Sequence, residues 1–261
     1  MYPPSFLAVP GRSGKPRVAG LTHMLDKGLG VIATRELLES HVDLVDIVKI
    51  GWGIAYVDSS AQRRIQTYAR AGVPVCLGGT LLEIAAAQNR VDELRVWALE
   101  IGVSMIEVSN GLGVLDADRK SQLIRTLSAD FTVLAEVGSK DDRPPVLAAS
   151  WAAEMERDLE SGAAWVIAEG RESGTVGLYG ADGHVREDLI AKLTSRVPVD
   201  RMIFEAPQKA QQTWFIRSLG PSVNLGNIGP DDLVALETLR LGLRADTALV
   251  GSLMLGSSSR R

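Results

Sequence analysis

Eight short apolar segments alternate with amphipathic segments along the whole chain. The apolar segments have the length of buried strands, whereas the segments between them repeat apolar residues at three- and four-residue intervals, as helices do. In "RVDELRVWALEIG", for example, Val91, Leu94, Ala98 and Ile101 share one face and the charges occupy the other. Strands that alternate with helices in this way predict a parallel sheet covered by helices.

Two architectures share this alternation. An open, doubly wound sheet usually carries a glycine fingerprint after its first strand, and "MLDKGLG" is a poor match to it. Eight strand–helix units in 261 residues, with no break in composition, instead predict a single (β/α)8 TIM barrel. We expect residues 1–16 to form a flexible arm and residues 252–261 a frayed tail.

Charge and composition exclude several classes of function. The 28 Lys and Arg residues against 32 Asp and Glu give a formal net charge of −4, which argues against nucleic acid as a partner. No apolar run approaches the roughly 20 residues of a membrane helix, and the prolines near the start are unlike a secretory signal. We therefore expect a cytoplasmic protein with no membrane partner. The single cysteine, Cys76, lies in "VPVCLGG", which favours a buried core thiol over a nucleophile.

Four of the predicted strands carry a glutamate near the C-terminal end, about one strand–helix unit apart. They are Glu107, Glu136, Glu169 and Glu205. A single carboxylate in this place is more often a local hydrogen-bond acceptor. Barrel enzymes, however, build their active sites at this rim. Here four glutamates in register face three cationic residues, Lys27, Lys49 and Arg171. Carboxylates this close repel one another and need a cation, and hard oxygen ligands suit Mg²⁺. We expect the last three glutamates to bind the metal and Glu107, which lies earlier relative to its strand end, to stand behind them.

The loop "EGRESGTVGLYG" combines opposed charges with many glycines. Arg171 can donate two parallel hydrogen bonds to a phosphate, and Gly170, Gly174 and Gly177 let backbone N–H groups approach a ligand. The structural alternative is a rim ion pair between Arg171 and Glu172 on an ordinary loop. We favour the anion-binding interpretation.

Several of these segments together resemble the phosphosulfolactate synthase family, from about residue 17 to residue 247. "EGRESG", "FEAPQK" and the stretch from "SVNLGNI" to "LETLRLGLRADT" are highly specific in combination. The resemblance implies a (β/α)8 barrel that adds sulfite to phosphoenolpyruvate with the help of Mg²⁺, giving (2R)-3-phosphosulfolactate. It also implies a homo-oligomer, for which the five tryptophans include helix positions able to anchor an interface.

The resemblance and this chemistry together suggest a role for each candidate residue. Sulfite attack at C3 places charge on the substrate carboxylate, and a general acid must then protonate C2 from one face. Lys140 matches the lysine-bearing position of the family and is the predicted acid, with Lys49 and Lys27 next; its alternative is a solvated lysine beside two aspartates. The predicted substrate-binding residues are Arg171, Asp26, Gly174, Lys209, Asn224 and Arg240. Arg240 lies late in a helix, where a cation also complements the helix dipole without any ligand.

The chain departs from the family pattern at three positions. His23 stands where an apolar residue is usual, and Gly226 and Ala245 replace a usual alanine and glycine. These departures leave open a phosphoenolpyruvate enzyme with another nucleophile, and the family also includes stress-associated homologues without established activity. The full set of carboxylates and lysines argues against a non-catalytic scaffold, because buried charges have no purpose there.

Overall fold

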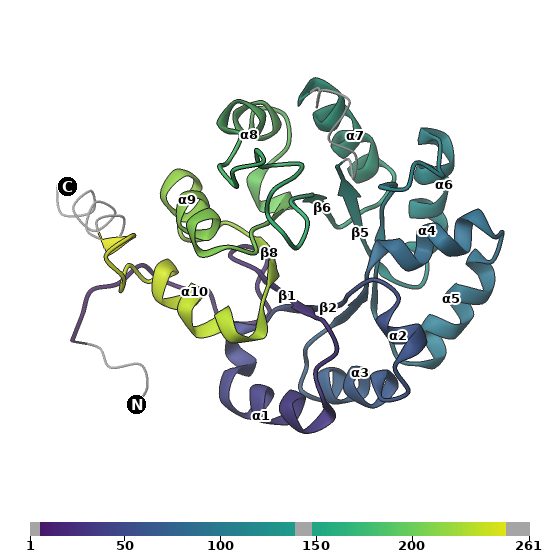
Figure 1. Cartoon of the computed structure of the whole chain (residues 1–261), viewed down its shortest axis with the longest axis horizontal. Coiled ribbons are helices and arrows are strands. Elements are labelled where there is room, and N and C mark those ends of the chain that lie inside the picture. Colours follow the sequence, from purple (N-terminus) through teal and green to yellow (C-terminus); the bar gives the residue numbers. More distant parts are fainter. Residues whose placement is uncertain (1–5, 139–147, 249–261) are drawn as a thin grey trace.

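The computed structural model describes residues 6–138 and 148–248, which form a closed eight-stranded parallel barrel with strand order β1 to β8. Helices surround the barrel in sequence order (Figure 1). The strands are β1 Thr22–Asp26, β2 Ile47–Ile50, β3 Val75–Leu77, β4 Met105–Val108, β5 Thr132–Val137, β6 Trp165–Ala168, β7 Met202–Glu205 and β8 Leu225–Ile228. The predicted (β/α)8 fold is confirmed.

Ten α-helices lie in the described residues, and every strand after β1 follows a helical segment. The α-helices are α1 Val31–His41, α2 Ile54–Val57, α3 Ala61–Arg70, α4 Gly79–Ala87, α5 Val91–Glu100, α6 Ala117–Leu127, α7 Ala148–Glu160, α8 Glu187–Thr194, α9 Lys209–Leu219 and α10 Leu233–Arg240. Short 3₁₀ turns cover Val42–Leu44, Val199–Arg201 and Pro230–Asp232. None of the helices in this described part is long and apolar enough to span a membrane.

Two separate apolar layers hold the barrel together. The larger lies between the strands and the helices, and the smaller fills the barrel interior. The interior cluster consists of Leu21, Ile47, Cys76, Met105, Leu134, Ile167 and Ile203. Because side chains alternate across a strand, the residue two positions after an interior one also points inward. This alternation decides which residues at the strand ends point into the mouth of the barrel and which point toward the helices.

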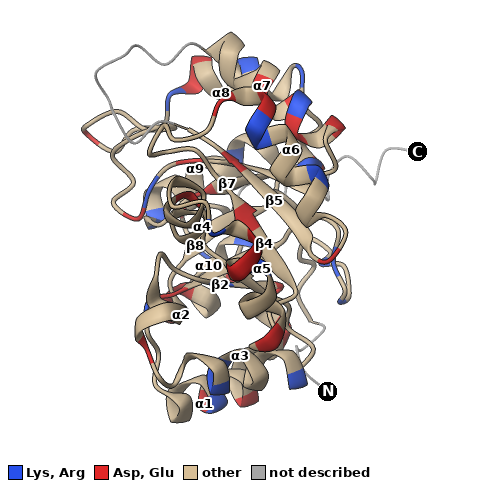
Figure 2. Cartoon of the chain, turned by 90° about the vertical axis from the view of Figure 1, so that its right-hand side faces the viewer, with Lys and Arg blue, Asp and Glu red and all other residues tan. Residues whose placement is uncertain are grey.

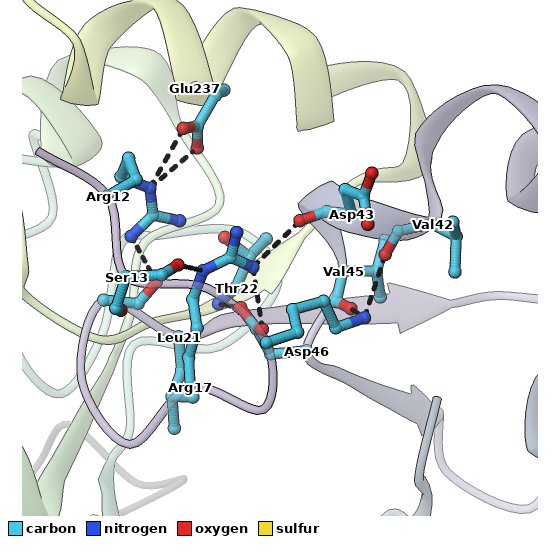
Figure 3. A network of polar contacts seen from close by, with 12 residues as sticks. Arg12, Ser13, Arg17, Leu21, Thr22, Val42, Asp43, Val45, Asp46 and Glu237 are labelled. Atoms are coloured by element: carbon cyan, nitrogen blue, oxygen red, sulfur yellow. Dashed lines mark hydrogen bonds and ion pairs between the residues drawn. The ribbon is translucent and has the colours of Figure 1, made fainter. Parts of the chain in front are cut away.

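The N-terminal arm is held in place at the end of the barrel where the strands begin, opposite the C-terminal mouth. Arg12 pairs with Glu237 of α10 at 2.9 Å, and Arg17 pairs with Asp46 at 3.0 Å (Figure 3). Lys15 donates to the carbonyl oxygens of Val42 and Val45. Arg12 and Lys15 lie in the second half of the predicted flexible arm, residues 1–16, and their side chains bind α10 and the segment before β2. Residues 1–5 and the predicted tail lie outside the described residues.

Candidate active site

A cavity of about 360 Å³ opens at the C-terminal mouth of the barrel. Residues from the ends of all eight strands, or from the loops that follow them, line it. They are Leu25, Lys49, Gly51, Trp52, Gly78, Gly79, Thr80, Glu107, Leu112, Glu136, Glu169, Arg171, Glu172, Glu205 and Asn227. Many other charged residues lie on the helices around the barrel (Figure 2), whereas Lys49, Glu107, Glu136, Glu169 and Glu205 are buried at its mouth.

A layer of charge lies directly above the apolar interior of the barrel. In five strands a buried apolar residue is followed two positions later by a charged one: Ile47 by Lys49, Met105 by Glu107, Leu134 by Glu136, Ile167 by Glu169 and Ile203 by Glu205. The period of two places all five charges on the inner face, at the same end of the barrel. All four glutamates of the sequence prediction therefore line one cavity.

Lys49 is the buried cation of this layer. Its Nζ lies 3.0 Å from a carboxylate oxygen of Glu107 and 3.0 Å from one of Glu205. The other oxygens of these two carboxylates accept backbone hydrogen bonds, from Gly79 N–H and Gly170 N–H, each at 2.9 Å. Glu107 is thus part of the cavity wall and binds Lys49 directly, whereas the sequence had suggested a place behind the other glutamates.

The electrostatics of the layer leave negative charge in excess. Burial opposes the charge of Lys49, but Glu107, Glu205 and Glu136 outweigh it and raise the lysine pKa well above its usual value. Burial also raises the pKa of Glu136 well above its usual range, and repulsion from Glu205, Glu107 and Glu169 adds to the effect. One lysine therefore does not neutralise the group, and a bound cation would relieve the repulsion.

The donor set fits a hard divalent cation in its chemistry. Within the described residues, no three acidic, His or Cys side chains are already gathered as metal ligands. Lys49 and Gly170 engage the Glu205 carboxylate, while Glu136 has no hydrogen-bond donor among the described side chains. Mg²⁺ commonly takes one or two carboxylates and keeps several waters, so a pair such as Glu136 and Glu169 suffices.

Unusual backbone conformations concentrate around the cavity. Four non-glycine residues of the described chain have positive φ, and three of them line the cavity: Trp52 at 46°, Arg171 at 55° and Asn227 at 55°. Such conformations are costly for residues other than glycine and cluster at functional sites. Asn227 also keeps its side-chain oxygen buried without a hydrogen-bond donor from the described residues.

The loop after β6 folds back over the strand that precedes it. Leu178 N–H donates to the Glu169 carbonyl at 3.0 Å, and the Tyr179 hydroxyl donates to the Glu205 carbonyl. A Cβ at Gly177 would lie 2.1 Å from the Glu169 oxygen, and one at Gly170 would lie 2.4 Å from the Tyr179 ring. The glycines thus permit a tight return that sets Arg171 on the cavity wall, with its Nε 3.8 Å from Glu169.

Asp26 does not face the cavity, contrary to the prediction. It lies two positions after the outward-facing Met24, and its carboxylate accepts from Arg64 at 3.2 Å and Tyr68 at 3.1 Å, both on α3. Its other oxygen accepts from the N–H groups of Gly28 and Leu29. Asp26 ties the first strand to its helix.

Asn224 and Arg240 lie at the wrong end of the barrel for substrate binding. Asn224 precedes β8, where its side chain accepts from Leu21 N–H at 2.9 Å and donates to Met202 O at 2.9 Å. Arg240 donates to the carbonyl oxygens of Leu21, Pro221 and Val223. Both predictions are corrected: these side chains join the N-terminal ends of the strands.

The remaining predicted residues lie near the mouth but off the cavity wall, or outside the described chain. Lys27 is exposed in the turn after β1, and Lys209 pairs with Asp246 at 2.8 Å. Gly174 has φ of +66° and its carbonyl accepts from Gln211, so it shapes the loop rather than the cavity. Lys140 lies outside the described residues.

The sequence placed Thr80 at a strand end but assigned no role in the site to the start of α4, which forms part of the cavity wall. Gly78, Gly79 and Thr80 line the cavity, and a Cβ at Gly79 would lie 2.2 Å from the Ser109 hydroxyl. Glu83 on the same helix accepts from Ser109 Oγ and from Leu112 N–H, which fixes the loop that carries Leu112 to the cavity. The paired glycines of "LGGT" were the available signal.

His23 and Gly226 prove to be neighbours in the barrel interior. A Cβ at Gly226 would lie 3.3 Å from His23 Nδ1 and 3.0 Å from an Ile203 methyl carbon. The glycine therefore leaves room for the larger ring. Burial, with the added effect of Lys49, holds the pKa of His23 well below its usual value, so the imidazole is neutral. Cys76 is buried in the same interior, and burial raises its thiol pKa, in line with a core residue.

Solved structures share the fold. Orotidine 5'-phosphate decarboxylase from Pyrococcus horikoshii superposes with a TM-score of 0.56 at 11% identity, covering 84% of this chain and 98% of that one. 3-Hexulose-6-phosphate synthase from Salmonella typhimurium superposes with a TM-score of 0.53 at 16% identity, covering 88% and 94%. At these identities the likeness concerns the barrel alone.

Sequence comparisons are more specific. Residues 10–246 match the family model described as (2R)-phospho-3-sulfolactate synthase (ComA). Phosphosulfolactate synthase of Methanothermobacter thermautotrophicus is 43% identical over 244 residues, covering 91% of this chain and 95% of the relative. That of Bacillus subtilis is 38% identical over 244 residues, covering 92% and 97%. The chain belongs to the (2R)-phospho-3-sulfolactate synthase family.

Proposed function

We propose that this chain adds sulfite to C3 of phosphoenolpyruvate and releases (2R)-3-phosphosulfolactate. The observation that carries the proposal is the buried layer of four glutamates and Lys49 at the barrel mouth, in a chain that matches its family over residues 10–246. Sulfite forms the new carbon–sulfur bond at C3, the π electrons of the substrate move toward its carboxylate, and a proton is then added at C2. The residues must therefore hold two anions, stabilise charge at a carboxylate and deliver one proton.

Arg171 binds the phosphate in this scheme. Its left-handed backbone and the tight return of the loop set the guanidinium on the cavity wall, with about a third of the side chain exposed. The guanidinium offers paired donors in the geometry of phosphate oxygens. Backbone groups at the start of α4 lie on the same cavity wall and favour an anion through the helix dipole.

Glu136 and Glu169 would hold Mg²⁺, while the Glu205 carboxylate, engaged by Lys49 and Gly170 N–H, lines the same cavity. When bound, the ion would act as a Lewis acid toward the substrate carboxylate, where negative charge develops. Lys49 holds Glu107 and Glu205 in place through two contacts of 3.0 Å. An ammonium group held by two carboxylates is a weak acid, so we assign protonation of C2 to Lys140 rather than to Lys49 or Lys27.

The deciding experiment is incubation of the purified protein with phosphoenolpyruvate, sulfite and Mg²⁺, followed by mass spectrometry. A phosphorylated sulfonate that requires all three components, and disappears with excess chelator, supports the proposal. Consumption of phosphoenolpyruvate only with another nucleophile would favour a related lyase instead. No turnover with any nucleophile would favour a non-catalytic role; one relative, HEAT-STRESS-ASSOCIATED 32 of Arabidopsis thaliana, is 36% identical over 85 residues, covering 33% of this chain and 28% of that protein.

Replacing Arg171 with lysine is expected mainly to raise the KM for phosphoenolpyruvate. An anion clamp acts in the ground state and the transition state alike, so kcat should change little. Loss of one charge-assisted hydrogen bond of about 1.5–3 kcal/mol corresponds to roughly a 10- to 100-fold rise. Steady-state kinetics at saturating sulfite measure it. A normal KM would remove Arg171 from phosphate binding.

Replacing Lys140 with alanine is expected to lower kcat by about 10²–10⁴-fold with little change in KM. A proton donor acts only after sulfite has added, so substrate affinity should persist. Slow protonation should also reduce facial selectivity, and chiral analysis of the product would then show some S isomer. Normal, stereospecific turnover would show that another group is the acid.

We also propose that the protein is a homo-oligomer. Trp52, Tyr56 and Val57 are large apolar residues that remain exposed beside the cavity. Tyr56 makes an edge contact with Trp97 of α5, with ring centroids 6.2 Å apart, so an apolar contact joins α2 to α5 at this surface. Light scattering at micromolar concentration should give a multiple of 28.0 kDa. A monomeric mass would contradict this.

A further inference from the structure

A second buried lysine lies behind the strand that carries Glu136. Lys120 of α6 is 2% exposed, although lysine is almost never buried without partners. Its Nζ donates to the backbone oxygen of Glu136 at 2.9 Å, to Asp158 at 2.7 Å and to Glu154 at 2.7 Å. These three bonds use all the donors that an ammonium group has.

The place of this lysine connects the helix layer to the cavity. Helices α6 and α7 pack side by side against β5 (Figure 1), and both acidic partners of Lys120 lie on α7. The carboxylate of Glu136 lines the cavity on the inner side of the same strand. Lys120 therefore joins two outer helices to the main chain of a residue whose side chain faces the substrate.

The charge on Lys120 is stable in this setting. Burial opposes it, but Asp158 and Glu154 outweigh burial and raise the pKa of the lysine above its usual value. Burial raises the pKa of Asp158 to about 6, a shift that Lys120 only partly offsets. The pair is thus costly to bury, and a helix pair that needed only to pack on a strand could use apolar residues instead.

We propose that Lys120 is a positioning residue: by binding the Glu136 carbonyl, it fixes the end of β5 so that the Glu136 carboxylate stays in the cation site of the cavity. This inference rests on the proposed function, because it assigns Glu136 a bound cation and a role in turnover. An error of about 1 Å in the position of a catalytic group can cost on the order of 10²-fold in rate.

The test separates positioning from folding by the double substitution Lys120→Met with Asp158→Leu. Exchange of a buried ion pair for apolar residues is often neutral or stabilising, so this variant should keep the thermal midpoint of the wild type. Glu154 is about a third exposed and remains solvated. We expect kcat/KM to fall by about 10-fold or more, and the affinity for Mn²⁺, measured by electron paramagnetic resonance without substrate, to fall at least several-fold.

Arg240→Met is the matched control. It also removes a buried cation bound to strand-end carbonyls, but at the opposite mouth of the barrel. It should lower the thermal midpoint and leave both kcat/KM and Mn²⁺ affinity of the folded protein unchanged. A stable double variant with wild-type kinetics and wild-type Mn²⁺ affinity would overturn the inference.

The Mn²⁺ measurement also distinguishes a failure of this inference from a failure of the proposed function. If the wild type forms no sulfonate but binds Mn²⁺, weaker binding in the double variant alone still supports the positioning role. Equal binding in the two proteins would refute it. A wild-type chain that binds no Mn²⁺ overturns the inference as well, because Lys120 would then have no cation ligand to position.

Discussion

Replacing Lys49 with methionine should lower the free energy of unfolding by about 3–5 kcal/mol near neutral pH. Lys49 is buried, and both of its ion-pair partners, Glu107 and Glu205, are buried too. Removal of the cation leaves these carboxylates and Glu136 facing one another in a small cavity. Either they stay charged and repel, or they take up protons, and both outcomes cost stability at pH 7.

The pH dependence of this deficit has a definite sign. In the wild type the pKa of Lys49 is raised, so its stabilising contribution is complete below the pKa of a free lysine and is lost only in strong alkali. In the variant, Glu107 and Glu136 lose their cation, and their pKa values, already raised by burial, rise further. Raised carboxyl pKa values favour the folded state as pH falls, so the deficit should shrink toward pH 5.

Urea unfolding at pH 5 and pH 8 measures this effect. Lys209→Met serves as the control, because Lys209 and its partner Asp246 are well exposed and such pairs contribute only about 0–1 kcal/mol. If Lys49→Met costs no more than the control at pH 8, the cavity glutamates are not held by Lys49 in the way described here.

The fold and much of the candidate site could be read from the sequence because both depend on local periodicity. Alternating segments predicted the barrel, and the recurring strand-end glutamates predicted a shared rim, which the cavity confirms for Glu107, Glu136, Glu169 and Glu205. The sequence prediction did not take into account that alternate side chains of a strand face opposite sides of the barrel wall. Asp26 follows the outward-facing Met24 by two positions, so it had to face the helices.

Other errors came from contacts between residues far apart in the chain. Arg240 lies in the last helix, yet it binds the carbonyl of Leu21 before the first strand. The arm is held in the same way, through Arg12 and Glu237. No local pattern distinguishes a cation that binds substrate from one that binds strand ends, because both need only a buried oxygen partner.

Replacing Glu136 with glutamine should lower kcat by about 10²–10³-fold, since it removes charge stabilisation at the reacting group. The same substitution should raise the stability of the protein without a bound cation. Burial and three neighbouring carboxylates raise the pKa of Glu136 in the folded state, so its ionised form costs stability above the pKa of a free glutamate. Glutamine has nearly the same shape without that cost.

The gain in stability should therefore appear at pH 7 and vanish below about pH 4, where the wild-type carboxyl is protonated in both the folded and the unfolded state. Glu107→Gln is the comparison: burial raises the pKa of that carboxyl too, but its contact with Lys49 offsets part of the cost, so the gain in stability should be smaller than for Glu136→Gln. Thermal unfolding in chelator and steady-state kinetics in Mg²⁺ give the two readouts. A Glu136→Gln protein that is both active and no more stable would show that this carboxylate neither holds the cation nor carries unrelieved charge.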